Sequence, residues 1–317
     1  MEKVQLANTG QMVSVLCSGA LYYGTKIDKQ TSYALLDAFL DAGGNFIDTA
    51  NMYAHWIAEH FKGGESEAVL GQWMKDRKSR NNVFLSSKMG ISYVGVENGL
   101  KPKQVFEECH KSLKRLQTDY IDLYFAHADD FTVPMEDYLE AFNRLVEQGK
   151  VRCIGASNFE NWRFTESRLL SKARGWADFK VIQNRYSYLR PKLGWKNGLQ
   201  RHLTQDMIDY CSYNNIAIMG YSAQLGGYYA NPNKEIEEGY LGADFSNREA
   251  TLEAVARECN TTKITVALAW LIQGKPSIIP VFASSNLEQL NESLRCLNVK
   301  FSDEQINRMN NAGGWSS

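Results

Sequence analysis

The sequence contains no apolar run long enough to cross a bilayer. A membrane-spanning helix needs about 18–20 consecutive apolar residues, and no segment of the chain approaches that length. The first six residues, Met-Glu-Lys-Val-Gln-Leu, also lack the apolar stretch of a secretory signal. We therefore expect no membrane partner, and a cytoplasmic protein fits this composition.

Closely spaced cysteines and an excess of one charge are absent as well. The six cysteines are scattered and form no Cys-x-x-Cys pair, which argues against a disulfide framework or a zinc site and favours reduced thiols. The formal net charge of -1 gives no reason to expect nucleic acid as a partner. His55 and His60 lie close in sequence, but no third ligand is evident, so we expect no bound metal.

The early part of the chain also lacks Gly-x-Gly-x-x-Gly, the fingerprint of a doubly wound dinucleotide-binding sheet. Short apolar runs that predict strands instead alternate with amphipathic segments that predict helices, with no Pro/Gly-rich linker. The predicted strands cover residues 15–20, 45–50, 83–88, 121–127, 153–157, 180–184, 216–221 and 277–281. A hairpin of residues 4–6 and 12–15 precedes them. The pattern predicts an α/β fold, a single (β/α)8 TIM barrel over residues 1–317.

Helices are expected between and after these strands. The predicted ranges are 29–42, 65–78, 102–116, 135–148, 162–173, 203–213, 248–258, 264–272 and 287–297, with a last helix capped by Ser302 and Gln305. Two connections, Asn51–Gly64 and Ala223–Asn247, are unusually long. Loops of that length in a compact domain are usually lids or binding loops.

Four polar residues follow or end predicted strands: Asp48, Tyr53, Lys88 and His127. Taken singly, the tyrosine could be a packing residue, the aspartate a cap and the histidine a core residue. A lysine that closes a hydrophobic strand is harder to explain by packing, because burying an unpaired ammonium is costly. Together at the C-terminal ends of barrel strands, these groups can move a proton at neutral pH.

The motifs around these residues resemble the aldo-keto reductase superfamily, in particular its bacterial-type, short-loop members. The resemblance extends over nearly the whole chain. It rests on Phe46–Ala50 with Tyr53, Ser87-Lys88, Leu123–His127, Gly155–Phe159, Gln183, Tyr221-Ser222, Ile279-Pro280 and Leu287–Leu290. It implies a (β/α)8 barrel that binds extended NADP(H) and reduces the carbonyl of a small aldehyde, ketone or sugar-like substrate.

The resemblance also implies a role for each of the four residues. The nicotinamide supplies the hydride and Tyr53 the proton. The Lys88 ammonium is expected to lower the pKa of the phenol below its usual value of about 10. Asp48 is expected to hold Lys88 in place, and His127 to bind the substrate oxygen.

Family positions further predict the cofactor site. Ser157, Asn158 and Gln183 are expected at the nicotinamide carboxamide, and Tyr221 is expected to stack on the ring. The alternatives are that Asn158 caps the following helix and that Tyr221 is ordinary core. Further contacts are predicted along the pyrophosphate and adenosine, at Ser222, Gln224, Gly226, Ala283, Ser285 and Gln289.

The choice between NADP(H) and NAD(H) depends on the adenosine end of the site. Residues 280–286 lack the Lys or Arg that often meets the 2′-phosphate. Serines and backbone amides at the start of the next helix can still bind an anion, which keeps NADP(H) open. The resemblance implies NADP(H), with NAD(H) possible.

Aromatic residues in the loops predict the substrate contacts. These are Tyr22, Tyr23, Trp56 and Phe131, with His55 nearby. Asp129 and Asp130 would either disfavour anionic substrates or lie in a solvated loop. Two other functions remain open, a nucleotide-binding sensor with slow turnover and a barrel hydrolase with paired carboxylates. The sequence specifies neither the physiological substrate nor the oligomeric state.

Overall fold

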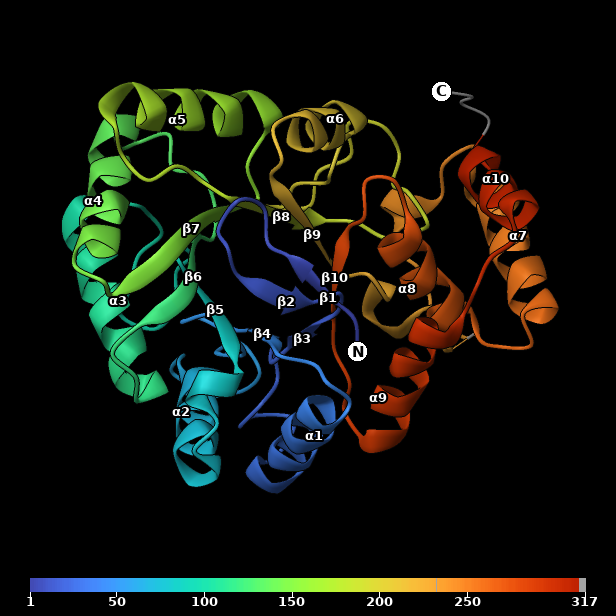
Figure 1. Cartoon of the computed structure of the whole chain (residues 1–317), viewed down its shortest axis with the longest axis horizontal. Coiled ribbons are helices and arrows are strands. Elements are labelled where there is room, and N and C mark those ends of the chain that lie inside the picture. Colours follow the sequence, from blue (N-terminus) through green and yellow to red (C-terminus); the bar gives the residue numbers. More distant parts are fainter. Residues whose placement is uncertain (232, 314–317) are drawn as a thin grey trace.

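A closed barrel of parallel strands forms the centre of the molecule (Figure 1). The computed structural model describes residues 1–231 and 233–313. The barrel strands are β3 (Cys17–Gly19), β4 (Phe46–Asp48), β5 (Phe84–Met89), β6 (Ile121–Ala126), β7 (Val151–Ser157), β8 (Val181–Arg185), β9 (Ala217–Tyr221) and β10 (Ile279–Phe282). Each strand pairs with the next in sequence, and β10 pairs with β3 to close the ring. The predicted (β/α)8 barrel is confirmed.

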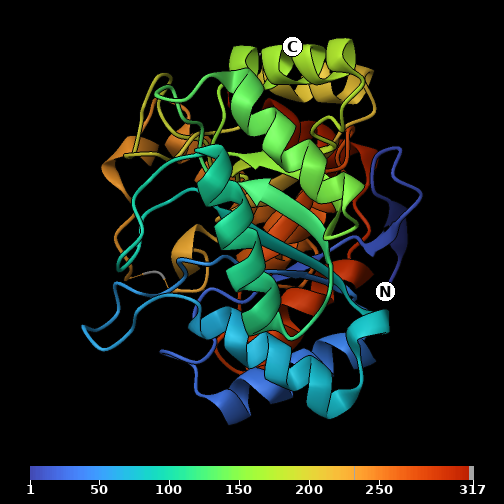
Figure 2. The ribbon, with the colours of Figure 1, turned by 90° about the vertical axis from the view of Figure 1, so that its left-hand side faces the viewer.

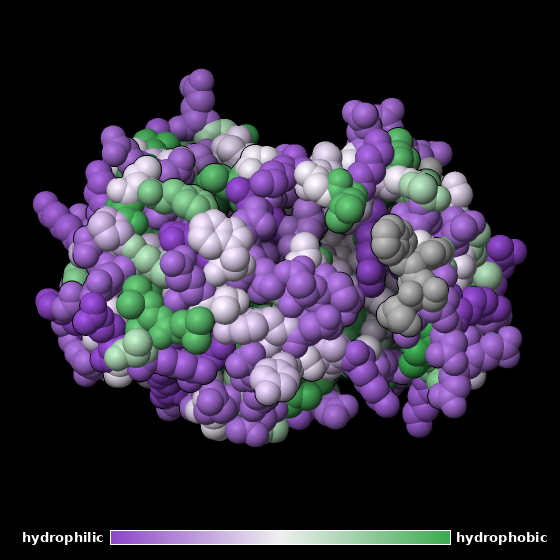
Figure 3. All heavy atoms as spheres, turned by 90° about the horizontal axis from the view of Figure 1, so that it is seen from above, coloured by the Kyte–Doolittle hydropathy of each residue, from purple (hydrophilic) through white to green (hydrophobic). Residues whose placement is uncertain are grey.

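Helices surround the barrel, as the periodicity predicts. They are α1 (Lys29–Asp41), α2 (Glu65–Arg77), α3 (Pro102–Leu116), α4 (Met135–Glu147), α5 (Asn161–Arg174), α6 (Gln205–Tyr213), α7 (Phe245–Glu258), α8 (Lys263–Gln273), α9 (Leu287–Leu294) and α10 (Asp303–Asn311). The predicted Ser302–Gln305 capping box at the start of α10 is present. Figure 3, a view over α5 and α6, shows a face that is hydrophilic over most of its area, as expected for the outer sides of amphipathic helices.

The sequence prediction differs from the structure mainly at element ends and in short helices. The helix predicted over 287–297 ends at Leu294 and continues as the 3-10 turn η4 (Arg295–Asn298). Three further 3-10 turns, η1 (Arg80–Asn82), η2 (Leu225–Gly227) and η3 (Glu238–Tyr240), were not predicted. Two of them lie in the long 223–247 connection, where hydrophobic periodicity gives no signal for a single turn.

The N-terminal hairpin closes one end of the barrel. Its strands β1 (Lys3–Gln5) and β2 (Met12–Ser14) pair antiparallel, as predicted. Leu6 and Val13 pack there against Phe46 and Phe84 from the beginnings of β4 and β5. The long loops leave the opposite end of the barrel, where the strands end (Figure 2). The hairpin therefore leaves only the C-terminal mouth open for a site.

Within the described part of the chain, every helix is too short or too polar to span a bilayer.

Candidate active site

The side-chain alternation of the barrel strands brings the predicted site residues to one mouth. Phe46, Phe84, Leu123 and Val181 point into the barrel and form its inner core. Because side chains alternate with a period of two, the residues two or four positions further along these strands also face inward. By this alternation Asp48, Lys88, His127 and Gln183 come to the C-terminal mouth above the inner core.

The Lys88 ammonium is buried and fully hydrogen-bonded. Its Nζ donates to Asp48 Oδ2 at 2.5 Å, to the Tyr53 hydroxyl at 2.7 Å and to the Thr49 carbonyl at 2.9 Å. Both Lys88 and Asp48 are 0% exposed. Burial lowers the pKa of Lys88, while Asp48 raises it. Three acceptors for three N–H groups hold the amine in one orientation toward Tyr53.

Asp48 is the centre of the hydrogen-bond network. Its Oδ1 accepts from Ser86 Oγ at 2.7 Å and from Gln183 Nε2 at 3.2 Å, and its Oδ2 accepts from Lys88 and from the Tyr53 hydroxyl at 3.3 Å. A buried carboxylate is tolerated when it is paired and hydrogen-bonded in this way. Asp48 therefore fixes the lysine and the phenol relative to each other.

The Tyr53 phenol does not have the lowered pKa that the sequence analysis expected. Burial raises the pKa of Tyr53 well above its usual value of about 10, and the neighbouring Asp48 raises it further. The phenol oxygen lies 2.7 Å from Lys88 Nζ and 3.3 Å from Asp48 Oδ2, so a negative charge acts on it beside the positive charge of the ammonium. Tyr53 is consequently protonated at neutral pH, which suits a proton donor.

His127 lies beside Tyr53 at the mouth. The two ring centroids are 6.0 Å apart, and the rings meet edge to face. Burial lowers the pKa of His127 well below its usual value, and the charge of Lys88 adds to this effect. The imidazole is therefore neutral at pH 7. Its buried Nδ1 has no hydrogen-bond partner among residues 1–231 and 233–313.

The residues predicted for the nicotinamide carboxamide lie next to this network. Asn158 Nδ2 donates to the His127 carbonyl at 2.8 Å and to Ser157 Oγ at 3.1 Å. Asn158 Oδ1 accepts from the Tyr221 hydroxyl at 2.7 Å and from the Arg201 amide at 3.1 Å. All bonding positions of the amide are thus used, and a bond from Asn158 to a ligand requires one of them to break.

The alternative that Asn158 caps the following helix is wrong. The N-cap of α5 is Glu160, and it makes no side-chain cap bond. Asn158 itself has a left-handed backbone with φ of 59°, a conformation that Asn adopts more readily than most residues. The side chain is thereby directed to His127 and Tyr221 instead of to the helix.

The residues predicted for the pyrophosphate and adenosine also come together. Gln224 links its own loop to the segment after β10 and to α9. Its Oε1 accepts from the Ala283 amide at 3.1 Å, and its Nε2 donates to Ser293 Oγ in α9 at 3.0 Å. The Ser285 amide donates to Gln289 Oε1 at 2.8 Å at the start of α9. Between them, Ser284 Oγ is buried without a partner in the described residues.

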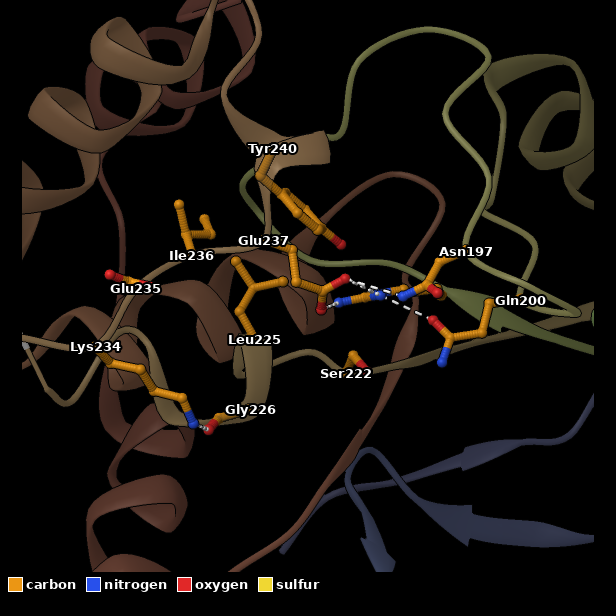
Figure 4. Close-up of a pocket in the computed structure, with 11 residues that line it drawn as sticks. Asn197, Gln200, Ser222, Leu225, Gly226, Lys234, Glu235, Ile236, Glu237 and Tyr240 are labelled. Atoms are coloured by element: carbon orange, nitrogen blue, oxygen red, sulfur yellow. Dashed lines mark hydrogen bonds and ion pairs between the residues drawn. The ribbon is translucent and has the colours of Figure 1, made fainter.

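A pocket of about 240 Å³ adjoins Ser222 and Gly226, two further predicted cofactor residues (Figure 4). Arg185, at the end of β8, forms an ion pair there with Glu237. Among the described residues this carboxylate is its only partner of opposite charge. Gln200 Oε1 accepts from Arg185 at 2.8 Å, and Asn197 Nδ2 donates to Glu237 at 3.1 Å. Arg185 and Glu237 were not predicted as site residues. The available signal was an arginine at a strand end, in the alternation that also places Gln183.

The predicted substrate residues lie in different environments. Trp56 is 49% exposed and Phe131 is 64% exposed, both in loops of the C-terminal face. Tyr22 is partly buried with Lys26 over its ring. Tyr23 is 3% exposed and packs in the main core, so its position favours a packing role.

The carboxylates of Asp129 and Asp130, expected either to disfavour anionic substrates or to lie in a solvated loop, are hydrogen-bonded within the protein. Asp129 forms a bidentate pair with Arg163, at 2.7 and 2.9 Å. Asp130 is 8% exposed and accepts from the backbone amides of Leu100 and Thr132, both at 2.8 Å. The interpretation as a solvated loop is therefore wrong for these carboxylates, because both are bonded within the protein.

Metal-ligating side chains do not gather in the described chain. Among residues 1–231 and 233–313, no three His, Cys, Asp or Glu side chains are placed to hold one ion.

A closed parallel barrel with ionisable side chains at its C-terminal mouth is typical of a (β/α)8-barrel enzyme. Comparison with known proteins identifies the family. Residues 15–313 match the model of the Aldo/keto reductase family, so the chain belongs to that family. It is therefore an oxidoreductase of a family that uses nicotinamide nucleotides.

Curated relatives support the same assignment over nearly the full length. A norsolorinic acid reductase of Aspergillus flavus is 29% identical over 98% of this chain and 80% of its own. A norsolorinic acid reductase of Emericella nidulans is 31% identical over 94% of this chain and 77% of its own. An aryl-alcohol dehydrogenase [NADP(+)] of Phanerodontia chrysosporium is 28% identical, over 95% and 83% respectively.

A solved structure has the same fold. The crystal structure of a thermostable aldo-keto reductase with the inhibitor epalrestat superimposes with a TM-score of 0.76. It is 24% identical, and the match covers 99% of this chain and 100% of that one.

Proposed function

We propose that the protein is an NADP(H)-dependent reductase of aldehyde or ketone carbonyls, with Tyr53 as the proton donor. The observation that carries this proposal is the partly buried contact of the Tyr53 hydroxyl with Lys88 Nζ at 2.7 Å, beside His127 at the mouth. A paired-carboxylate hydrolase is less consistent with the site, because Asp48 is buried within hydrogen bonds to four side chains.

The chain's own residues supply the proton chemistry. The nicotinamide, when bound, would provide the hydride. The carbonyl oxygen then gains negative charge and needs a proton, which the protonated Tyr53 hydroxyl donates. The Lys88 ammonium stabilises the phenolate that remains, and the neutral His127 imidazole orients the substrate oxygen by a hydrogen bond.

The residues present fit a dinucleotide along the mouth. Ser157, Asn158, Gln183 and Tyr221 would hold the nicotinamide, and Ser222, Gln224 and Gly226 the pyrophosphate. The buried Ser284 hydroxyl, which has no partner among the residues that the structure describes, supports a ligand at the adenosine end. Ala283, Ser285 and Gln289 lie near it at the start of α9. The amides of Ala283 and Ser285 donate to the side chains of Gln224 and Gln289, and either amide would bind a phosphate only after that bond is released.

The preference for NADP(H) can be measured by tryptophan fluorescence. NADPH is expected to quench the intrinsic fluorescence at lower concentration than NADH, because the 2′-phosphate adds charge that the amides at the start of α9 attract. Equal quenching by both nucleotides, or stronger quenching by NADH, would overturn the cofactor choice.

Exposed aromatic residues favour an aryl carbonyl among the candidate substrates. Phe131 and Trp162 lie 6.1 Å apart between ring centroids, and each is more than half exposed. Such rings stack on planar apolar groups. A turnover panel should therefore rank aromatic aldehydes above aldose sugars of similar size. Absence of turnover with every carbonyl tested, together with tight nucleotide binding, would instead favour the sensor function.

The pKa values predict a flat pH profile for carbonyl reduction. Because the pKa of Tyr53 is raised and that of His127 is lowered, neither group titrates between about pH 6 and 9. The active form has a protonated phenol and a charged Lys88, whose pKa burial lowers, so the turnover number for reduction should fall only at alkaline pH, as one of these two groups loses its proton. A fall between pH 7 and 9 would show that the phenol ionises more easily than this environment implies.

A further inference from the structure

Tyr53 differs from the other three residues of the proposed site in the element that carries it. Asp48 and Lys88 lie within strands and His127 directly follows one, whereas Tyr53 lies in the connection 51–64, which we call the Tyr53 loop. This loop contains turns but no helix or strand. Ala54, next to Tyr53, has a left-handed backbone with φ of 63°, which is unfavourable for a non-glycine residue. Contacts from outside the loop must hold such a conformation in place.

A buried carboxylate from α3 makes these contacts at the start of the loop. Glu108 is 1% exposed, and its Oε2 accepts from Asn51 Nδ2 at 2.7 Å. The backbone amide of Asn51 donates to the Lys88 carbonyl at 3.1 Å. Asn51 thus connects Glu108 directly to the strand that carries the lysine, two residues before Tyr53.

The same carboxylate oxygen holds the end of the loop through Tyr93. The Tyr93 hydroxyl donates to Glu108 Oε2 at 2.6 Å. The Tyr93 ring packs on Gly63, where a Cβ would come within 2.5 Å of its Cδ2. Glu108 Oε2 therefore binds the start of the loop directly, through Asn51, and the end of the loop through Tyr93.

A neighbouring ammonium and hydrogen-bond donors stabilise the negative charge of Glu108. Lys111 Nζ donates to its Oε1 at 2.8 Å. Burial raises the pKa of Glu108, but the hydrogen bonds from Lys111, Tyr93 and Asn51 outweigh it and lower the pKa overall. The ionised form is therefore the one that holds the loop at neutral pH.

We propose that Glu108 is a positioning residue for proton transfer: by holding Asn51 and Tyr93 it fixes the Tyr53 loop and so the distance of the Tyr53 hydroxyl from Lys88 and the substrate. The inference rests on the proposed role of Tyr53. Glu108 touches neither substrate nor nucleotide, and it acts on turnover through the geometry of the loop alone.

Kinetics of Glu108→Ala against a matched neighbour test the proposal. Glu107, next to it on α3, is exposed and only weakly paired with Lys103 at 3.7 Å, so Glu107→Ala serves as the control. Glu108→Ala should lower the turnover number by about 10²-fold, the loss that a shift of about 1 Å in a reacting group produces. The dissociation constant for NADPH should stay within twofold. Glu108→Gln should recover part of the activity, because its amide oxygen can accept the bonds from Asn51 and Tyr93 that Glu108 Oε2 accepts.

Amide hydrogen exchange provides a measurement that is independent of turnover. Glu108→Ala should raise exchange in residues 51–64 and leave the barrel strands unchanged, whereas Glu107→Ala should change neither. Unchanged turnover, or an equal loss of nucleotide binding, would overturn the positioning role. Should Glu108→Ala fail to fold, Tyr93→Phe decides, because it keeps the ring on Gly63 and removes one bond to Glu108. Unchanged turnover and exchange in that variant also overturn the proposal.

The failure of this inference is distinguishable from failure of the proposed function. If Tyr53→Phe abolishes reduction but the Glu108 variants behave as wild type, only the positioning role is wrong. If Tyr53→Phe retains full turnover, the proposed proton donor is wrong, whatever the exchange experiment shows.

Discussion

Tyr53→Phe is expected to lower carbonyl reduction by about 10²–10⁴-fold, the usual contribution of a positioned proton donor. The substitution removes only the hydroxyl, which accepts from Lys88 at 2.7 Å and donates to Asp48 at 3.3 Å. The ring keeps its place beside His127, so the barrel should remain folded. Steady-state turnover with an aromatic aldehyde measures the loss.

Nucleotide binding separates this loss from general damage. The hydroxyl is not among the groups proposed to hold NADP(H), so Tyr53→Phe should bind the nucleotide nearly as tightly as the wild type. Tyr213→Phe is a suitable control, because Tyr213 is 92% exposed at the end of α6. A turnover number for Tyr53→Phe within a few-fold of that control would remove Tyr53 from the role of proton donor.

Lys88→Met is expected to have the second large effect, on both turnover and stability. It removes the charge that stabilises the phenolate, and a loss of about 10²–10³-fold in turnover is typical for one such electrostatic group. It also leaves the fully buried Asp48 without its ion-pair partner. Breaking a buried pair in this way costs about 3–5 kcal/mol of unfolding free energy.

Activity assays and chemical denaturation measure the two consequences of Lys88→Met. Lys103→Met provides the control, because the Lys103 side chain is 87% exposed and lies on α3. The double variant Lys88→Met with Asp48→Asn should regain part of the stability, since no unpaired charge then remains, but it should not regain turnover. Recovery of turnover in the double variant would contradict a direct role for the ammonium.

The strand alternation explains why the sequence predicts most of this site. Inward positions of β4, β5 and β8 begin with an apolar residue and carry Asp48, Lys88 and Gln183 two or four residues further on, so a period of two and the barrel closure together bring these side chains to one mouth. The N-terminal hairpin follows in the same way from two short runs around a turn.

Features that depend on contacts between distant segments could not be predicted in this way. Glu108 meets Asn51 across 57 residues, and no periodicity of α3 distinguishes it from the exposed Glu107. The pKa of Tyr53 depends on its burial and on its distance from Asp48 as well as from Lys88, which only the coordinates specify. The same holds for Asn158, whose left-handed backbone turns its side chain away from α5.

Deuterium transfer from the nucleotide to the alcohol tests whether the protein reduces a carbonyl with a hydride from the nicotinamide and a proton from Tyr53. Wild-type protein would be incubated with an aromatic aldehyde and NADPH that carries deuterium at the reactive position of the nicotinamide, and the alcohol would be analysed by mass spectrometry. We expect alcohol with one deuterium from the wild type and from Tyr213→Phe, and at most trace amounts of alcohol from Tyr53→Phe. Alcohol without deuterium from the wild type, or an equal yield of deuterated alcohol from Tyr53→Phe and the wild type, would contradict the proposed reaction.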